Sequence, residues 1–140
     1  LGIAGRVRLL PLAPPSQMAL LASKYDIGLS LETDVTKSRQ LCLTNKIFTY
    51  LLAGVPVLMS DTPAQRALAP DLGAATAVVS LPDPDEIAAT LDRLAPSAAL
   101  ALAKEMAAQL GRERYNWDYE KTILLEVVAR AFAGRERMGA

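Results

Sequence analysis

Short apolar runs alternate along this chain with longer stretches in which apolar residues recur every three or four positions. The short runs predict β-strands at residues 7–10, 27–31, 56–60 and 76–81. The periodic stretches predict helices at residues 17–24, between Thr44 and Gly54, at residues 63–69, from Asp83 or Asp85 to Leu94, after the Pro96-Ser97 break to about Arg114, and from Asn116 or Asp118 to Ala133. Strands that alternate with helices predict an α/β fold, with a parallel sheet of about four strands and helices on both faces.

Proline, glycine and polar residues mark the segments between these elements. Residues 11–15 and 70–73 are predicted turns, and residues 32–40 form a polar loop without apolar periodicity. The last residues, 134–140, are predicted to be a frayed tail. Parallel sheets bind ligands beyond the carboxyl ends of their strands, so the loops at residues 10–14, 31–44 and 60–62 are the candidate site.

The most informative stretch is the predicted helix that starts after Thr44 and the strand that follows it. Thr44 is a good N-cap, and Phe48, Leu51 and Leu52 share a predicted core face. Gly54 suits a left-handed helix end, and Pro56 opens the apolar strand where a missing N–H is tolerated. This order is typical of the second half of a parallel α/β unit.

The polar residues of this helix gather at its start. Asn45 and Thr49 lie four positions apart on one stripe, with Lys46 beside them. The free amides of a helix start, with its positive dipole end, favour a phosphate ligand. The same residues also fit ordinary capping and a solvated surface, and the Thr49 hydroxyl can bond the carbonyl one turn back.

Composition excludes several classes of function. Fifteen basic and fifteen acidic residues leave no net charge, which argues against a nucleic-acid binder. The chain has no histidine, which excludes a His-containing triad and His metal ligands. Cys42 is the only cysteine, so no internal disulfide forms and a reducing, cytoplasmic location is expected. We expect Cys42 to be a small buried apolar residue rather than a reactive thiol.

The segment from Asn45 to Val57, Asn-Lys-Ile-Phe-Thr-Tyr-Leu-Leu-Ala-Gly-Val-Pro-Val, resembles the donor-site helix of retaining group 1 glycosyltransferases of the GT-B fold. That helix typically reads Asn-Lys-x-Phe-Glu-Tyr-(Leu/Met)-x-Ala-Gly-x-Pro-Val. The resemblance extends from about Val7 to the aromatic cluster at residues 115–119, and the usual glutamate is replaced by Thr49. It implies that residues 1–140 are a single, partial Rossmann-like nucleotide-sugar-binding lobe, the C-terminal lobe of such an enzyme.

The resemblance implies a donor site for a nucleotide-diphosphate sugar. In it, Leu10, Pro11 and Leu12 offer backbone groups to the nucleobase, and Glu32 is the candidate for the missing carboxylate. Lys37 and Arg39 in the polar loop are candidates to meet phosphate oxygens, with Lys46 at the helix start, whereas a mobile surface loop accounts for the two loop cations equally well. The full set of predicted donor-binding residues is Leu10, Pro11, Leu12, Glu32, Arg39, Thr44, Asn45, Lys46 and Thr49. We assign no catalytic side chain, metal ligand or cofactor to this chain.

The chain starts at Leu1 without an initiator methionine, so we expect it to be part of a longer protein that supplies the acceptor lobe. The isolated chain is then expected to transfer no sugar, because group transfer needs both substrates held together.

Two alternatives stay open. One is another doubly wound nucleotide-binding domain, although no Gly-x-Gly-x-x-Gly stands between a strand and a helix. The other is a non-catalytic interaction module that kept the fold. Peripheral membrane association of the longer protein is also left open.

The resemblance raises a question about the sheet edge. In the family's strand order, 3-2-1-4-5-6, this chain matches only the last four strands, and missing strands would have separated residues 7–10 from residues 27–31. An unpaired strand edge invites pairing. We therefore predict that these two strands either pair directly or meet a partner chain, for example in a homodimer through the exposed edge.

Overall fold

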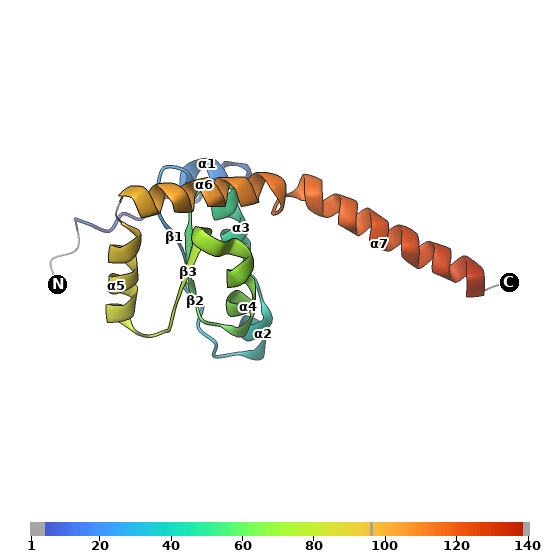
Figure 1. Cartoon of the computed structure of the whole chain (residues 1–140), viewed down its shortest axis with the longest axis horizontal. Helices are drawn as coiled ribbons and strands as arrows, with labels where there is room; N and C mark the ends of the chain where they lie inside the picture. Colours follow the sequence, from blue (N-terminus) through green and yellow to red (C-terminus); the bar gives the residue numbers. More distant parts are fainter. Residues whose placement is uncertain (1–4, 96, 139–140) are drawn as a thin grey trace.

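Three short apolar segments form one parallel sheet in the computed structural model, which describes residues 5–95 and 97–138 (Figure 1). The strands are β1 (Gly28–Ser30), β2 (Val57–Ser60) and β3 (Thr76–Val79), in the order β1-β2-β3. Leu29, Leu58 and Ala77 lie side by side in the register. The α/β class with a parallel sheet is confirmed, but the described residues contain three strands where about four were expected.

β2 is the central strand, and all four of its residues are buried. Successive side chains point to opposite faces of a strand. Val57 and Met59 therefore share one face and pack in the main core with Ile47 and Leu51. Leu58 points to the other face and is also fully buried. A strand covered on both faces reads as an unbroken apolar run, which is why this segment was easy to predict.

Helices cover both faces of the sheet, as predicted. α3 (Asn45–Leu52) and α4 (Pro63–Leu72) pack on the face of Val57 and Met59, and α5 (Pro84–Leu94) lies on the opposite side, against β3 (Figure 1). α6 (Ser97–Glu113) packs against α3 and against the short 3-10 helix η2 (Gly73–Ala75), from which β3 begins. Asp83 caps α5 by accepting hydrogen bonds from the amides of Asp85 and Glu86, which settles the two alternatives for this cap.

The core face of α3 differs from the predicted one. Ile47 and Leu51, four positions apart, are fully buried, and Phe48 is half-buried beside them. Leu52 is 51% exposed, so its assignment to the core was wrong. Leu52 follows Leu51 by one position, and a step of about 100° around the helix turns it away from the sheet. Gly54 has a φ of 68°, which confirms the left-handed end of this helix.

α4 continues three residues past its predicted end at residue 69. Pro70 lies inside the helix, and the predicted turn at residues 70–73 is helical up to Leu72. Proline in a helix loses one backbone hydrogen bond. Here Leu68 and Leu72 are both buried in the core, so the packing of this last turn outweighs that loss. The helix ends at Gly73, whose φ is 52°.

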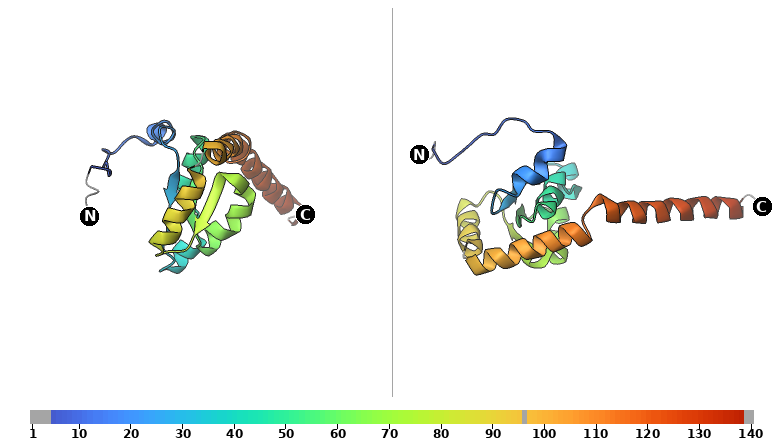
Figure 2. Two further views of the ribbon diagram at one scale, coloured as in Figure 1. Left: turned by 60° about the vertical axis from the view of Figure 1, so that its left-hand side comes forward. Right: turned by 90° about the horizontal axis from the view of Figure 1, so that it is seen from above.

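The predicted strand at residues 7–10 does not form. Residues 7–14 have no regular structure (Figure 2). Leu9 among them is 93% exposed. A 3-10 helix, η1 (Pro15–Gln17), and α1 (Met18–Ala22) follow it. The expectation that residues 7–10 pair directly with β1 is therefore wrong, because a strand needs a neighbour to satisfy its backbone and α1 packs on α3 instead. Pairing with a partner chain stays a prediction.

The polar loop at residues 32–40 contains a short helix that the pattern did not predict. α2 (Lys37–Leu41) begins after Thr36, whose side chain accepts a hydrogen bond from the amide of Arg39 at 3.3 Å. None of its residues is buried, so it lacks the stripe of apolar residues from which a helix is predicted. Cys42 follows and is exposed, so its prediction as a buried residue was wrong.

The last helix, α7 (Trp117–Met138), projects away from the other elements (Figure 1). The Asn116 side chain caps it by accepting from the amide of Tyr119 at 2.9 Å. Trp117 is 67% exposed and does not pack the helix onto the core. The predicted frayed tail is helical up to Met138, and residues 139–140 lie outside the described residues. Within the described part of the chain, no helix is both long and apolar enough to cross a membrane.

Candidate functional site

The carboxyl ends of β1 and β2 are joined by a network of buried polar side chains, which we call the strand-end network. The Ser60 hydroxyl donates to Gln65 Oε1 at 3.1 Å, and Gln65 Nε2 donates to the Ser30 hydroxyl at 3.3 Å. The Ser30 hydroxyl lies 3.2 Å from the Thr44 hydroxyl at the start of α3. Because Ser30, Ser60 and Gln65 are all buried, this network fixes the starts of α3 and α4 relative to both strands.

Glu32, directly after β1, binds two cationic side chains. Its Oε2 lies 2.9 Å from Arg39 Nη1 in α2, and its Oε1 lies 2.6 Å from Lys46 Nζ in α3. The Glu32 amide donates to the Ser60 hydroxyl at 2.8 Å, which ties the loop to the strand-end network. Three predicted site residues are thus brought together, but the carboxylate predicted to replace the family's missing glutamate is occupied by both cations.

The start of α3 has no side-chain cap. Thr44 stands at the N-cap position, but its side chain makes no capping hydrogen bond and its hydroxyl meets Ser30 instead. Its predicted role as a cap was therefore wrong, although its position is right. The first turn of α3 is thereby left without a side-chain acceptor, and such open amides favour an anion. The Thr49 hydroxyl donates to the Asn45 carbonyl at 3.0 Å, which is the ordinary local role left open above.

A cleft of about 720 Å³, which we call the α1–α3 cleft, lies between α3 and the segment that includes α1. Leu10, Pro11 and Leu12 line one wall, and Asn45, Lys46 and Thr49 line another. Apart from these, the lining is mostly apolar and includes Met18 and Leu21 of α1. An apolar cleft with a few polar groups at one end is the usual form of a small-molecule site.

One residue that lines the cleft, Tyr50 of α3, packs closely against β1. A Cβ atom at Gly28 would lie 2.4 Å from Cγ of Tyr50, so only glycine lets the Tyr50 ring approach the strand this closely. Tyr50 and Tyr25 both line the cleft, and neither was predicted as a site residue. One lies in a loop and the other in a helix, and no sequence pattern distinguishes a tyrosine that lines a cleft from one that packs in the core.

α3 is held from its other side by the segment after α6. The Phe48 ring lies 5.6 Å from the Tyr115 ring, and the Arg114 guanidinium stands 5.1 Å from the Tyr115 ring centre. The Tyr115 hydroxyl is buried without a hydrogen-bond partner among the described residues. Burial, opposed by the neighbouring Arg114 charge, raises the pKa of Tyr115 above its usual 10.0.

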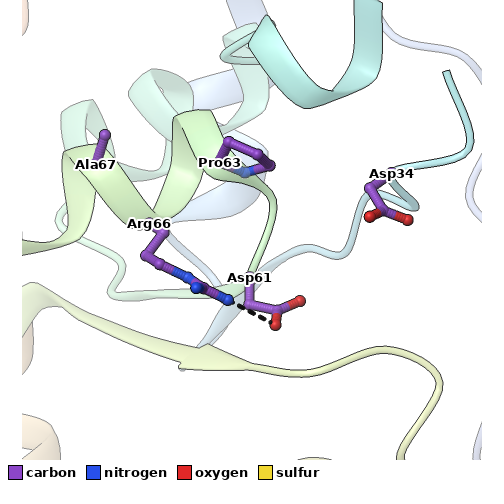
Figure 3. A pocket seen from close by; sticks show the side chains of 5 residues that line it. All are labelled: Asp34, Asp61, Pro63, Arg66 and Ala67. Carbon is purple, nitrogen blue, oxygen red and sulfur yellow. Dashed lines mark hydrogen bonds and ion pairs between the residues drawn. The ribbon is translucent and has the colours of Figure 1, made fainter. Parts of the chain in front are cut away.

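A second hollow, of about 530 Å³, lies at the carboxyl end of β2 and has a different character (Figure 3). Asp61 and Arg66 form an ion pair of 3.0 Å there, and Asp34 approaches from the loop after β1. The Ser80 hydroxyl donates to Asp61 at 3.3 Å. Its lining holds two carboxylates, Asp34 and Asp61, beside the cation of Arg66, whereas the lining of the α1–α3 cleft holds Lys46 and no carboxylate, so this hollow suits a phosphate ligand less well.

The structure therefore divides the predicted donor-binding residues between two connected places. Six of them line the α1–α3 cleft: Leu10, Pro11, Leu12, Asn45, Lys46 and Thr49. The other three lie outside that lining: Glu32 and Arg39 reach it only through Lys46, and Thr44 belongs to the strand-end network. Sequence reasoning missed Gln65, whose buried amide organises the strand ends. A glutamine in the first turn of a helix carries no signal that separates such a role from solvation.

Neither a metal-binding cluster nor a known relative identifies the function of this site. Among residues 5–95 and 97–138, no three His, Cys, Asp or Glu side chains come together in a group that could hold a metal ion. No protein-family model, curated protein or solved structure matches this chain.

Proposed function

We propose that this chain is the donor-binding part of a glycosyltransferase, and that the α1–α3 cleft binds a nucleoside diphosphate carrying a sugar. One observation supports this above the others. Residues 10–12 and the first turn of α3, far apart in the sequence, line one cleft, and Lys46 is the cation of that lining. The apolar walls suit a planar base, and Lys46 with the uncapped amides of α3 suits phosphate.

The chemistry of such a site is positioning and charge neutralisation. As the bond between sugar and diphosphate breaks, negative charge grows on the leaving diphosphate. Lys46 and the amides of α3 oppose that charge, and Arg39 can join them. The acceptor and the rest of the cleft come from the longer protein, so the isolated chain binds the donor without transferring sugar.

The first prediction concerns Lys46. We expect UDP or GDP to bind weakly to the wild-type chain, and Lys46→Ala to lower that affinity about tenfold, or ~1.4 kcal/mol, because a charge-assisted phosphate contact is lost. Isothermal titration calorimetry with UDP, GDP and NAD measures this directly. Stronger binding of NAD would favour a dinucleotide-binding domain instead.

The matched control is Lys121→Ala on α7, which removes the same charge from a helix that does not line the cleft. It should leave the affinity for UDP and GDP unchanged. If Lys46→Ala also leaves it unchanged, the site is misplaced.

A non-catalytic module is the second candidate. It is favoured by Thr49, whose hydroxyl is engaged with its own helix and supplies no carboxylate to a ribose. Sugar-transfer assays on the longer protein distinguish the two. Turnover that is lost when Lys46 is replaced supports the glycosyltransferase, whereas donor binding without turnover supports the module.

A further inference from the structure

Glu32 forms ion pairs with both cations that the proposed donor site would use. Each of its carboxylate oxygens takes one of them, Arg39 at 2.9 Å and Lys46 at 2.6 Å. The Glu32 side chain is only 12% exposed, whereas the Lys46 and Arg39 side chains are 43% and 53% exposed. The carboxylate is therefore the sheltered member of the group, and the two cations are its exposed partners.

The backbone around Glu32 keeps its carboxylate in place. Its amide donates to the Ser60 hydroxyl at 2.8 Å, and Ser60 is itself bonded to the buried Gln65. Arg39 and Lys46, by contrast, carry their charges on long, flexible stems. When a ligand competes for these charges, the cations are the groups that move.

Lys46 links this ion-pair group to the α1–α3 cleft, because it lines the cleft and also contacts Glu32. With Glu32 present, the three side chains carry one net positive charge, and without it they would carry two. A phosphate in the cleft must share Lys46 with Glu32 or draw it away. A neutral nucleoside in the same cleft meets no such competition.

We infer that Glu32 is a counter-ion that competes with the ligand's phosphates for Lys46 and Arg39, and thereby sets the selectivity of the cleft for phosphate charge. This inference rests on the proposed function, since it assumes a phosphate-bearing ligand. It assigns Glu32 a role opposite to that of a ribose acceptor: its removal strengthens binding of the diphosphate.

The test is Glu32→Gln, which keeps the size of the side chain and removes its charge. Affinity for UDP and GDP should rise about fivefold, the value of an ion pair of roughly 1 kcal/mol, while affinity for uridine and guanosine stays the same. The matched control is Asp34→Asn in the same loop, because Asp34 makes no ion pair among the described residues. It should change the diphosphate affinity by less than about twofold. Calorimetry on the whole chain measures all of these.

The outcomes separate the inference from the proposed function. If the wild type binds UDP or GDP but Glu32→Gln binds them no more tightly than Asp34→Asn does, the inference alone is overturned. An equal gain for the nucleosides also overturns it, since a merely structural change would act on base and phosphate alike. If neither wild type nor variant binds a diphosphate, the proposed function fails and the inference with it. Binding by Glu32→Gln alone supports both.

Should Glu32→Gln not fold, Glu32→Asp tests the same point, because its shorter carboxylate holds both cations less well and should also raise diphosphate affinity.

Discussion

Tyr115 lies outside the α1–α3 cleft but packs against α3, the helix that lines it. Its ring packs on Phe48 of α3, but its hydroxyl is buried without a hydrogen-bond partner in the described part of the chain. The ring is therefore useful to the fold, whereas the hydroxyl is a cost, because it lost its water on burial.

We predict that Tyr115→Phe stabilises the protein by about 1 kcal/mol, since it keeps the ring and removes the unsatisfied hydroxyl. The pH dependence should change as well. The pKa of Tyr115 is raised in the folded state, so above pH 10 the unfolded chain gives up this proton more readily than the folded chain. The wild type therefore has its full stability below that pH and loses part of it as the pH rises further.

The variant lacks this loss, so its advantage over the wild type should grow between about pH 9 and about pH 11. Urea denaturation at both pH values measures it. Tyr119→Phe is the control, because Tyr119 is exposed on α7, and it should behave as the wild type does in both measurements. A Tyr115→Phe protein that is less stable at both pH values would show that the hydroxyl has a partner.

At the scale of elements, the contact between α3 and α6 decides how α3 presents its first turn. Gly111 of α6 lies directly over the end of α3, and a Cβ atom there would be 2.4 Å from the Leu51 carbonyl oxygen. Ala103 and Ala107 of the same helix are also fully buried. Small residues let the two backbones come close, which a longer side chain would prevent.

We predict that Gly111→Ala destabilises the protein by about 1–3 kcal/mol, because the new methyl group meets backbone atoms that cannot rotate away. The sign of this change in stability is informative, because a glycine-to-alanine substitution at an exposed position inside a helix stabilises it by about 1 kcal/mol. Urea denaturation gives the free energy. Gln109→Ala, on the exposed side of the same helix, is the control and should change it by no more than about 0.5 kcal/mol. A stabilising Gly111→Ala would mean that α6 lies further from α3 than described.

At the scale of the whole molecule, α7 stands apart from the sheet and its helices (Figure 2). Apolar side chains among its residues 117–133, such as Leu124, Leu125 and Phe132, are exposed, and none of these residues belongs to the core. The core therefore closes before α7 begins, at Tyr115.

We predict that removing the chain from Trp117 onward shifts the midpoint of thermal unfolding by less than about 4 °C, because less than about 1 kcal/mol of stability is lost with this helix. Circular dichroism measures the midpoint. Removing the chain from Ser97 onward is the contrasting truncation. It deletes α6 with its buried Ala103 and Ala107 and exposes Leu51 and Ile47, so it should abolish cooperative unfolding. A large loss of stability on the first truncation would show that α7 packs on the rest of the chain in solution.

The unit from the start of α3 to the end of β2 could be predicted from the amino-acid sequence alone. Local patterns suffice there: a stripe of apolar residues, a glycine that takes a φ of 68°, and a strand buried along its whole length. The same kind of pattern found β1 and β3, and it brought Asn45 and Lys46 together, because neighbours on one helix turn need no tertiary contact to meet.

The other features of the fold and of the candidate site depend on tertiary packing. Residues 7–10 have the composition of a strand but no neighbouring strand to bond with, and α4 runs through Pro70 because Leu72 finds space in the core. The ion pairs of Glu32 and the bonds of Gln65 join residues from different elements, and their partners are set by how the chain packs. Hydrophobic periodicity indicates which face of an element is buried, but it does not indicate which other element covers that face. The candidate site depends on how the elements pack against one another.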